Sequence, residues 1–109
     1  MKLVTAILQD EDADGLLQAL IDKHYRATKI GSTGGFLRRG NTTILVGVTD
    51  HLVDDLINTI RENCQTRTQV INPAFPGIGP DLLQTPYQVE VEVGGATVFV
   101  QDVERFVRV

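Results

Sequence analysis

The chain has 109 residues, of which 42% are hydrophobic and 22% are charged, with a net charge of −4. This length suits one small domain, so we expect residues 1–109 to form a single domain. The apolar content excludes a disordered chain, and the negative charge argues against a protein that neutralises a long phosphate backbone. No apolar run approaches the roughly 20 residues of a membrane-spanning helix, and no signal peptide is recognisable. We therefore expect a cytoplasmic protein with no membrane or nucleic-acid partner.

The first half of the chain predicts one helix between strands. A nearly continuous apolar run is followed by acidic residues that suit a helix start, with Asp10 or Asp12 as the N-cap. Apolar residues then recur at helical spacing, and two further segments have the composition of strands, separated by a glycine-rich turn. The predicted strand, helix and two strands cover residues 2–8, 12–24, 26–32 and 42–48.

The pattern of strand, helix and strand then repeats about forty residues later. Thr49 or Asp50 is the expected N-cap of a second amphipathic helix, whose apolar stripe ends at Cys64. A strand over residues 65–71 follows. A doubled β-α-β unit is typical of the ferredoxin-like α+β fold. We expect an antiparallel sheet with two helices on one face and an opposite face that needs its own cover.

The last third of the chain predicts a long loop and a bent strand. Residues 72–86 contain all four prolines, which predicts a mobile loop. Residues 88–101 alternate as a strand does, and Gly94-Gly95 marks a bend. The strand valines predict an apolar sheet face that a monomer would not expose, and hence a homotrimer with inward-facing sheets. These valines are Val89, Val91 and Val93, with Val98 and Val100 or their alternates.

No combination of side chains predicts catalysis. His24 and His51 are the only histidines, and both fall within or beside predicted helices. Cys64 lies on an apolar stripe, and as the only cysteine it excludes an internal disulfide. The acidic run at residues 10–14 is better explained by the helix dipole than by a metal ion. We expect a protein that is not an enzyme and that uses no metal or cofactor.

Basic residues are concentrated in one segment. Residues 23–49 contain five of the ten lysines and arginines, no acidic residue and half of the glycines. This predicts a local site for a small anion, with a solvated basic loop as the alternative. Phe36 and Leu37 lie at a predicted loop tip beside glycine N–H groups, hydroxyls, an amide and guanidinium groups. Such groups together can hold a base and a phosphate, although the stretch is neither a P-loop nor a dinucleotide fingerprint.

Three blocks resemble the PII-like cyclic di-AMP receptor family. They are Arg-Ala-Thr-Lys at residues 26–29, the glycine-rich run at 33–43 and the strand at 89–100. The resemblance covers nearly the whole chain. It implies a ferredoxin-like, PII-like subunit that forms a homotrimer with three nucleotide sites in clefts between adjacent subunits. It also implies a non-enzymatic signalling role, in which cyclic di-AMP rearranges loops and an unidentified partner protein reads the change.

The resemblance also implies a set of ligand-binding residues, the first of which belong to the basic segment. Arg26 and Thr28 would lie on the second strand beside the ligand, with Thr28 bonding phosphate or base. Gly35, Phe36 and Leu37 would supply backbone contacts and an apolar wall for one adenine.

The remaining implied ligand residues come from two further strands. Asn41 would read an adenine edge, Gly47 would permit close backbone approach, and Phe99 would line the same cleft. Each has a packing role as its alternative, most strongly Phe99 as a strand aromatic and Gly47 as room for a neighbouring helix. The chain departs from the family at His24, where a small amide is expected, and at Arg108, in place of an uncharged polar residue.

Two other functions remain compatible with this sequence. One is a PII-like regulatory protein that binds ATP or a metal ion. The other is a nucleic-acid-binding ferredoxin-like domain in which strand aromatics stack on bases, and residues 95–100 faintly resemble such a strand. An aromatic content of 6% and a net charge of −4 argue against extended RNA binding. Competition between ATP and cyclic di-AMP in one titration would separate the nucleotide alternatives.

Overall fold

Six strands, two α-helices and one turn of 3-10 helix form the part of the chain that the structure describes. The structure is a computed structural model that describes residues 1–31, 40–71 and 89–109. The elements in chain order are β1 (Lys2–Gln9), α1 (Asp10–Asp22), β2 (Ala27–Gly31), β3 (Asn41–Val48), η1 (Asp50–Leu52), α2 (Val53–Asn63), β4 (Arg67–Ile71), β5 (Val89–Val93) and β6 (Ala96–Asp102). The loop expected at residues 72–86, with its expected mobility, lies outside the described residues.

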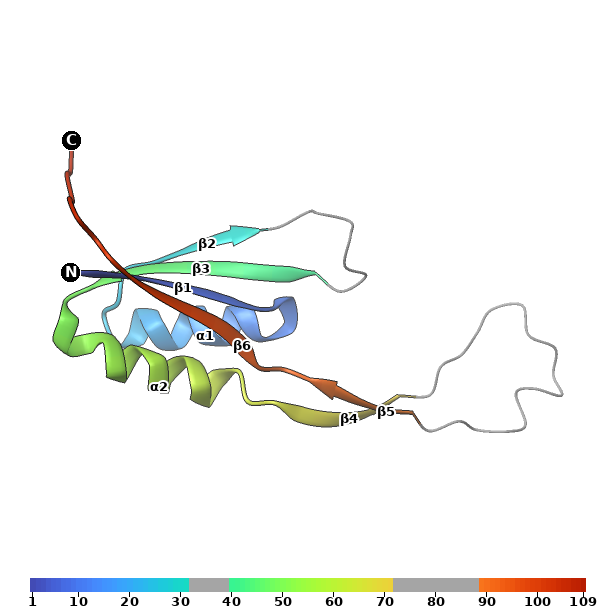
Figure 1. Cartoon of the computed structure of the whole chain (residues 1–109). Coiled ribbons are helices and arrows are strands. Elements are labelled where there is room, and N and C mark those ends of the chain that lie inside the picture. Colours follow the sequence, from blue (N-terminus) through green and yellow to red (C-terminus); the bar gives the residue numbers. More distant parts are fainter. Residues whose placement is uncertain (32–39, 72–88) are drawn as a thin grey trace, which may run out of the picture.

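Four strands form an antiparallel sheet in the order β2-β3-β1-β6. Both helices lie on one side of this sheet (Figure 1). The two central strands, β1 and β3, each begin one β-α half, as the doubled β-α-β pattern requires. The predicted α+β, ferredoxin-like class is therefore confirmed. Neither described helix is long and apolar enough to cross a membrane.

The core lies between the sheet and the helices because alternate strand residues point to opposite faces. The helix-facing residues of β1 and β3 and the inner stripes of α1 and α2 are almost fully buried: Val4, Ala6, Leu8, Ile44, Val46, Leu16, Leu20, Leu56 and Ile60. The residues between them on β1 and β3, such as Thr5 and Leu45, are half-buried on the opposite face. None of the described helices covers that opposite face, which we call the open face.

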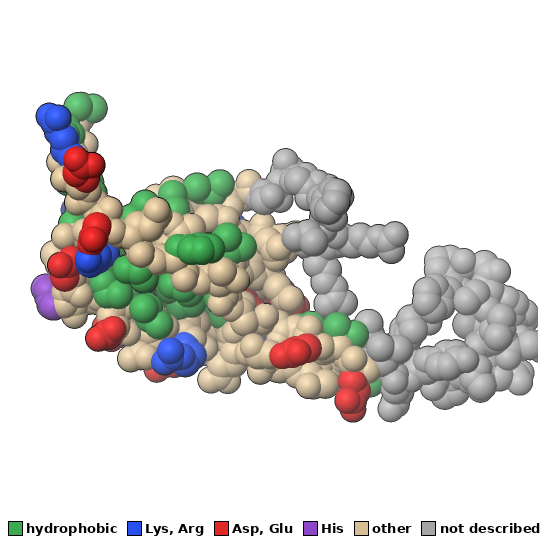
Figure 2. Space-filling view, viewed as in Figure 1, with side chains coloured by type: hydrophobic (Ala, Val, Ile, Leu, Met, Phe, Trp, Pro, Cys, Tyr) green, Lys and Arg blue, Asp and Glu red, His purple; other side chains and the backbone are tan. Residues whose placement is uncertain are grey.

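Strands β4 and β5 form a separate two-stranded sheet. The strand expected at residues 65–71 therefore exists but does not join the main sheet, whose fourth strand is β6. Gly94 and Gly95 separate β5 from β6 with φ angles of 88° and 80°, and a Cβ at Gly94 would overlap the carbonyl oxygen of Gln65. The chain turns there, and the β4–β5 hairpin extends beyond the body (Figure 1). Acidic side chains lie on its visible surface (Figure 2).

This arrangement corrects the residues expected on the open face. β5, with its alternating valines, lies outside the four-stranded sheet, and Val98 packs against the core on the helix side. The alternate residue Phe99 lies on the open face instead. The apolar side chains of that face come mainly from other strands, and they are Leu3, Ile7, Ile30 and Leu45.

The N-cap predicted for the first helix is wrong, whereas Thr49 does stand at the N-cap position of η1, the turn that leads directly into α2. Helix α1 starts at Asp10, two residues earlier than expected, so Gln9 precedes it and makes no side-chain cap hydrogen bond. Thr49 precedes η1, again without a side-chain cap, and α2 follows only from Val53. Asp10 instead accepts a hydrogen bond from Thr42 at the start of β3. The early acidic residues therefore connect α1 to other elements.

Candidate functional site

Five of the eight predicted ligand residues fall within the described chain. Gly35, Phe36 and Leu37 lie outside it. Thr28 pairs with Leu45, Leu45 pairs with Thr5, and Thr5 pairs with Phe99. Residues directly opposite one another in antiparallel strands point to the same side of the sheet. Thr28 and Phe99 therefore lie in one row across the open face.

The structure brings only some of these residues together within one subunit. Gly47 is one step past the last β2–β3 pair, beside Arg26 and near Thr28, and all three are exposed. Phe99, 53% exposed, lies on the opposite edge of the sheet, three strand spacings or about 14 Å from Thr28. Asn41 lies six residues before Gly47 on β3, about 20 Å away along the strand. One subunit therefore presents separate parts of the predicted site.

The two packing alternatives can be judged from burial. Gly47 is exposed on the open face, and a Cβ there would meet only the end of Met1, at an ordinary 3.8 Å. Gly47 is therefore not needed to make room for a neighbouring helix within the subunit. Phe99 is a strand aromatic, yet more than half of its surface is accessible, so it contributes little to the core. Within the subunit, neither residue is explained by packing.

The connection from α1 to β2 places the Arg26 end of the site. The hydroxyl of Tyr25 donates a hydrogen bond to the Asp55 carboxylate at 2.5 Å, and the Lys23 ammonium donates to Thr59 at 2.9 Å. Burial, and after it the hydrogen bond to the Asp55 carboxylate and the negative charge of that group, raises the pKa of Tyr25 to about 12. The Tyr25 hydrogen bond holds the pKa of Asp55 below its usual value. Both contacts anchor the residues before Arg26 to α2.

This anchor was missed from the sequence, because its members are about thirty residues apart. A single aromatic residue between a helix end and a strand was the available signal. His24, one of the departures from the family pattern, adopts a positive φ of 66° at this turn. Arg108, the other departure, is exposed in the extended tail after β6.

Asn41 borders a hollow of about 270 Å³ at the far end of the open face. Its other walls come from the end of β1 and from the β5–β6 junction. They include Gln9, whose side-chain oxygen accepts a hydrogen bond from the Gly94 N–H at 2.9 Å, together with Gly95 and Thr97. These junction residues were not singled out from the sequence, where the glycines indicated only a bend.

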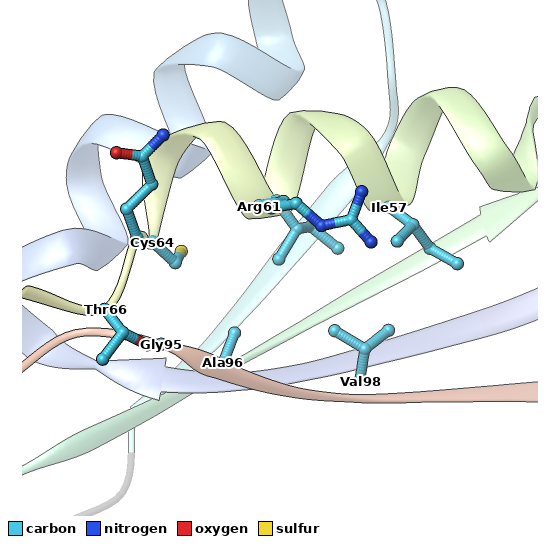
Figure 3. A pocket seen from close by; sticks show the side chains of 9 residues that line it. Ile57, Arg61, Cys64, Thr66, Gly95, Ala96 and Val98 are labelled. Carbon is cyan, nitrogen blue, oxygen red and sulfur yellow. The ribbon is translucent and has the colours of Figure 1, made fainter.

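A second groove, of about 380 Å³, runs between α2 and β6 (Figure 3). Ile57 and Arg61 extend from α2 on one side, and Ala96 and Val98 lie across from them on β6 (Figure 3). Cys64 lies at its end, where burial raises the pKa of the thiol to about 11, so the thiol stays protonated at neutral pH. None of the five predicted ligand residues that the structure describes lines this groove.

The acidic run at the start of α1 is divided among separate partners. Asp12 and Glu11 face the Arg67 guanidinium at 3.0 and 3.7 Å, and Asp14 pairs with Lys29 at 3.2 Å. In the described part of the chain, no three His, Cys, Asp or Glu side chains converge as metal ligands do. The run therefore serves to join α1 to the strands around it.

Comparison with known proteins identifies the family of this chain. The family model described as "Cyclic-di-AMP receptor" matches residues 1–109. The crystal structure of a functionally unknown protein from Pediococcus pentosaceus ATCC 25745 is 41% identical, with a TM-score of 0.75 over 99% of this chain and 96% of that one. A family match over the whole length, together with the sheet and helices described above, leads to one conclusion. The chain belongs to the cyclic-di-AMP receptor family.

Proposed function

We propose that this chain is a non-enzymatic, cytoplasmic receptor for cyclic di-AMP, that residues 1–109 form its single domain, and that three copies assemble into a ring. The family is a receptor family, which supports cyclic di-AMP as the ligand. The observation that carries the proposal is the distribution of the ligand residues. The described ones share one open sheet face, where Arg26 and Thr28 lie at the β2 edge, Phe99 lies at the β6 edge, and Gly47 and Asn41 lie on β3 next to the β2 edge.

A site divided between two edges becomes complete when copies meet edge to edge. In a ring, the β2 edge of one subunit contacts the β6 edge of the next, as heterologous interfaces do. Arg26, Thr28 and Gly47 of one subunit then face Phe99 of its neighbour. The same assembly turns the half-buried apolar residues of the open faces inward, which gives them the cover that a lone subunit lacks. Three equivalent clefts result, one for each subunit.

Each described side chain has a chemical role in such a cleft. The Arg26 guanidinium suits a phosphate oxygen pair, and the Thr28 hydroxyl can donate to phosphate or accept from a base. Gly47 leaves the sheet flat, so a planar ligand can approach the backbone. The Phe99 ring offers a stacking surface for adenine, and Asn41 has the donor and acceptor pattern that pairs with the edge of adenine. Binding would rearrange the adjoining loops, and a partner protein would recognise the change.

Titration calorimetry and light scattering test this proposal. We expect cyclic di-AMP to bind with one ligand per subunit, and ATP and cyclic di-GMP to bind far more weakly. We expect a particle of about three times the 12.0 kDa chain mass. Binding of ATP with no response to cyclic di-AMP would favour the regulatory alternative, and a monomeric mass at micromolar concentration would refute the shared cleft.

A further inference from the structure

Asp10 contacts the chain on both sides of Asn41. Its backbone N–H donates to the Gly40 carbonyl at 3.1 Å, and its carboxylate accepts from the Thr42 hydroxyl at 2.5 Å. The first contact adds one step to the β1–β3 ladder beyond its last pair, Gln9 with Asn41. One residue of α1 therefore holds the backbone immediately before and after the proposed adenine-reading residue.

The fit at this point is close. The Asp10 carboxylate lies directly over Gly40, where any Cβ would overlap its Oδ2 atom. Thr42 is only 2% exposed, so its hydroxyl is removed from solvent and needs the partner that Asp10 supplies. Loss of the carboxylate would leave a buried donor without its partner and would open space beside Gly40. Asp10 and Thr42 therefore depend on each other.

Because side chains alternate along β3, the contact between Asp10 and Thr42 lies on the opposite face of the sheet from the proposed ligand. The Thr42 side chain points toward the helices, whereas Asn41, its neighbour, belongs to the open face and borders the hollow there. Asp10 thus acts from behind the sheet and has no place on the ligand side. An amide reads adenine through two hydrogen bonds with narrow distance limits, so a small shift of the backbone weakens both.

We propose that Asp10 is a positioning residue for Asn41: it fixes the start of β3 so that the amide meets the adenine edge. The proposal rests on the proposed function, since it requires that Asn41 touch the ligand. Asp10 sets affinity and base selectivity without touching the nucleotide. It also accounts for a carboxylate that the sequence suggests as a helix cap but that the structure directs to β3.

The first test measures cyclic di-AMP affinity by calorimetry in three variants of the full chain and one control variant. Asp10→Ala is expected to lose about tenfold, because it removes a hydrogen bond to a charged group. Thr42→Val keeps the side-chain shape without the donor and is expected to lose a similar factor. Asp10→Asn retains an acceptor oxygen and is expected to stay within about twofold of the parent. Asp54→Ala, an exposed carboxylate on α2, is the control and is expected to bind as the parent does.

A double-mutant cycle separates positioning from general loosening of the fold. In an Asn41→Ala background, Asp10→Ala and Thr42→Val are expected to change the affinity less than twofold, because the amide they position is already gone. An equal loss in both backgrounds would overturn the proposal, as would a loss in Asp10→Asn equal to that in Asp10→Ala. If Asp10→Ala fails to fold, Thr42→Val completes the same cycle.

The selectivity readout keeps this inference distinct from the function it rests on. The ratio of cyclic di-AMP to cyclic di-GMP affinity is expected to fall in Asp10→Ala and to remain at the parent value in Asp54→Ala. A parent protein that does not bind cyclic di-AMP would refute the proposed function, and this inference with it. A parent that binds normally, with unchanged affinity in Asp10→Ala, would refute the role of Asp10 alone.

Discussion

Phe99→Ala is expected to weaken cyclic di-AMP binding by about sixtyfold without unfolding the subunit. A phenylalanine side chain presents roughly 200 Å², and Phe99 is 53% exposed in the subunit, so about 100 Å² is available for a ligand to cover. At about 25 cal/mol per Å² this corresponds to about 2.5 kcal/mol. One factor of ten in affinity is about 1.4 kcal/mol, which gives the sixtyfold loss. Calorimetry measures the loss, and thermal melting checks the fold.

The neighbouring residue on β6 provides a matched control for this prediction. Val100 is 42% exposed, and its side chain points to the opposite side of the strand. Val100→Ala is expected to leave the ligand affinity within about twofold, and light scattering should show that both variants assemble as the parent does. The reasoning is refuted if Phe99→Ala binds as tightly as the parent, or if the two variants lose affinity equally.

Three further predictions concern the contacts that hold the site in place. Tyr25→Phe should lower the melting temperature by about 4 °C at pH 7. The difference in melting temperature between parent and variant should shrink as the pH falls through the lowered pKa of Asp55, because the carboxylate that accepts the hydrogen bond is then lost. The stability of the parent should also decline as the pH rises from 10 to 12, because Tyr25 ionises more readily in the unfolded chain. A gap that is the same at pH 3 and pH 7 would contradict this role. Arg67→Ala removes the ion pair between β4 and α1, so amide hydrogen exchange in β4 and β5 should accelerate with little change in melting temperature. Unchanged exchange would show that the β4–β5 hairpin does not depend on this ion pair. Gly94→Ala forces a side chain into a positive φ and against a carbonyl, and urea unfolding should show a loss of about 1–3 kcal/mol, whereas a neutral result would contradict the backbone geometry.

The α+β class could be predicted from the periodicity of the apolar residues, because that periodicity follows from which face of each strand and helix is buried. The apolar run of β1 and the stripes of α1 and α2 are the residues that form the core. Helix α1, at Asp10–Asp22, begins and ends two residues before the expected range of 12–24. The partner of each strand could not be predicted, because a doubled β-α-β pattern does not say which later strand returns to the sheet. Gly94-Gly95 indicated a bend, yet only the fold shows that the bend separates β5 from β6.

The residue types of the candidate site can be recognised in the sequence, whereas its geometry cannot. Residue types near Arg26 indicate an anion site because charge and glycines are adjacent in the sequence. Pairing register is a long-range property, so the row shared by Thr28 and Phe99 has no local signal. The same holds for the contact of Asp10 with Thr42, which joins residues 32 positions apart. Side chains that support a site from another element are therefore the ones that sequence patterns miss.

The division of the site between two sheet edges has a thermodynamic consequence. On the proposed arrangement, a lone subunit offers Arg26 and Thr28 at one edge of the sheet and Phe99 at the other, about 14 Å apart. Each edge of a lone subunit therefore offers a ligand only part of the contacts of the complete cleft. A ligand held by both halves binds the ring better than the separated chains, and it must stabilise the ring by the same free energy. Ligand affinity and assembly are then one linked equilibrium. A substitution on the open face that weakens the ring would lower affinity without touching the nucleotide, so a loss of affinity is assigned to the ligand contact only when the mass of the assembly is unchanged.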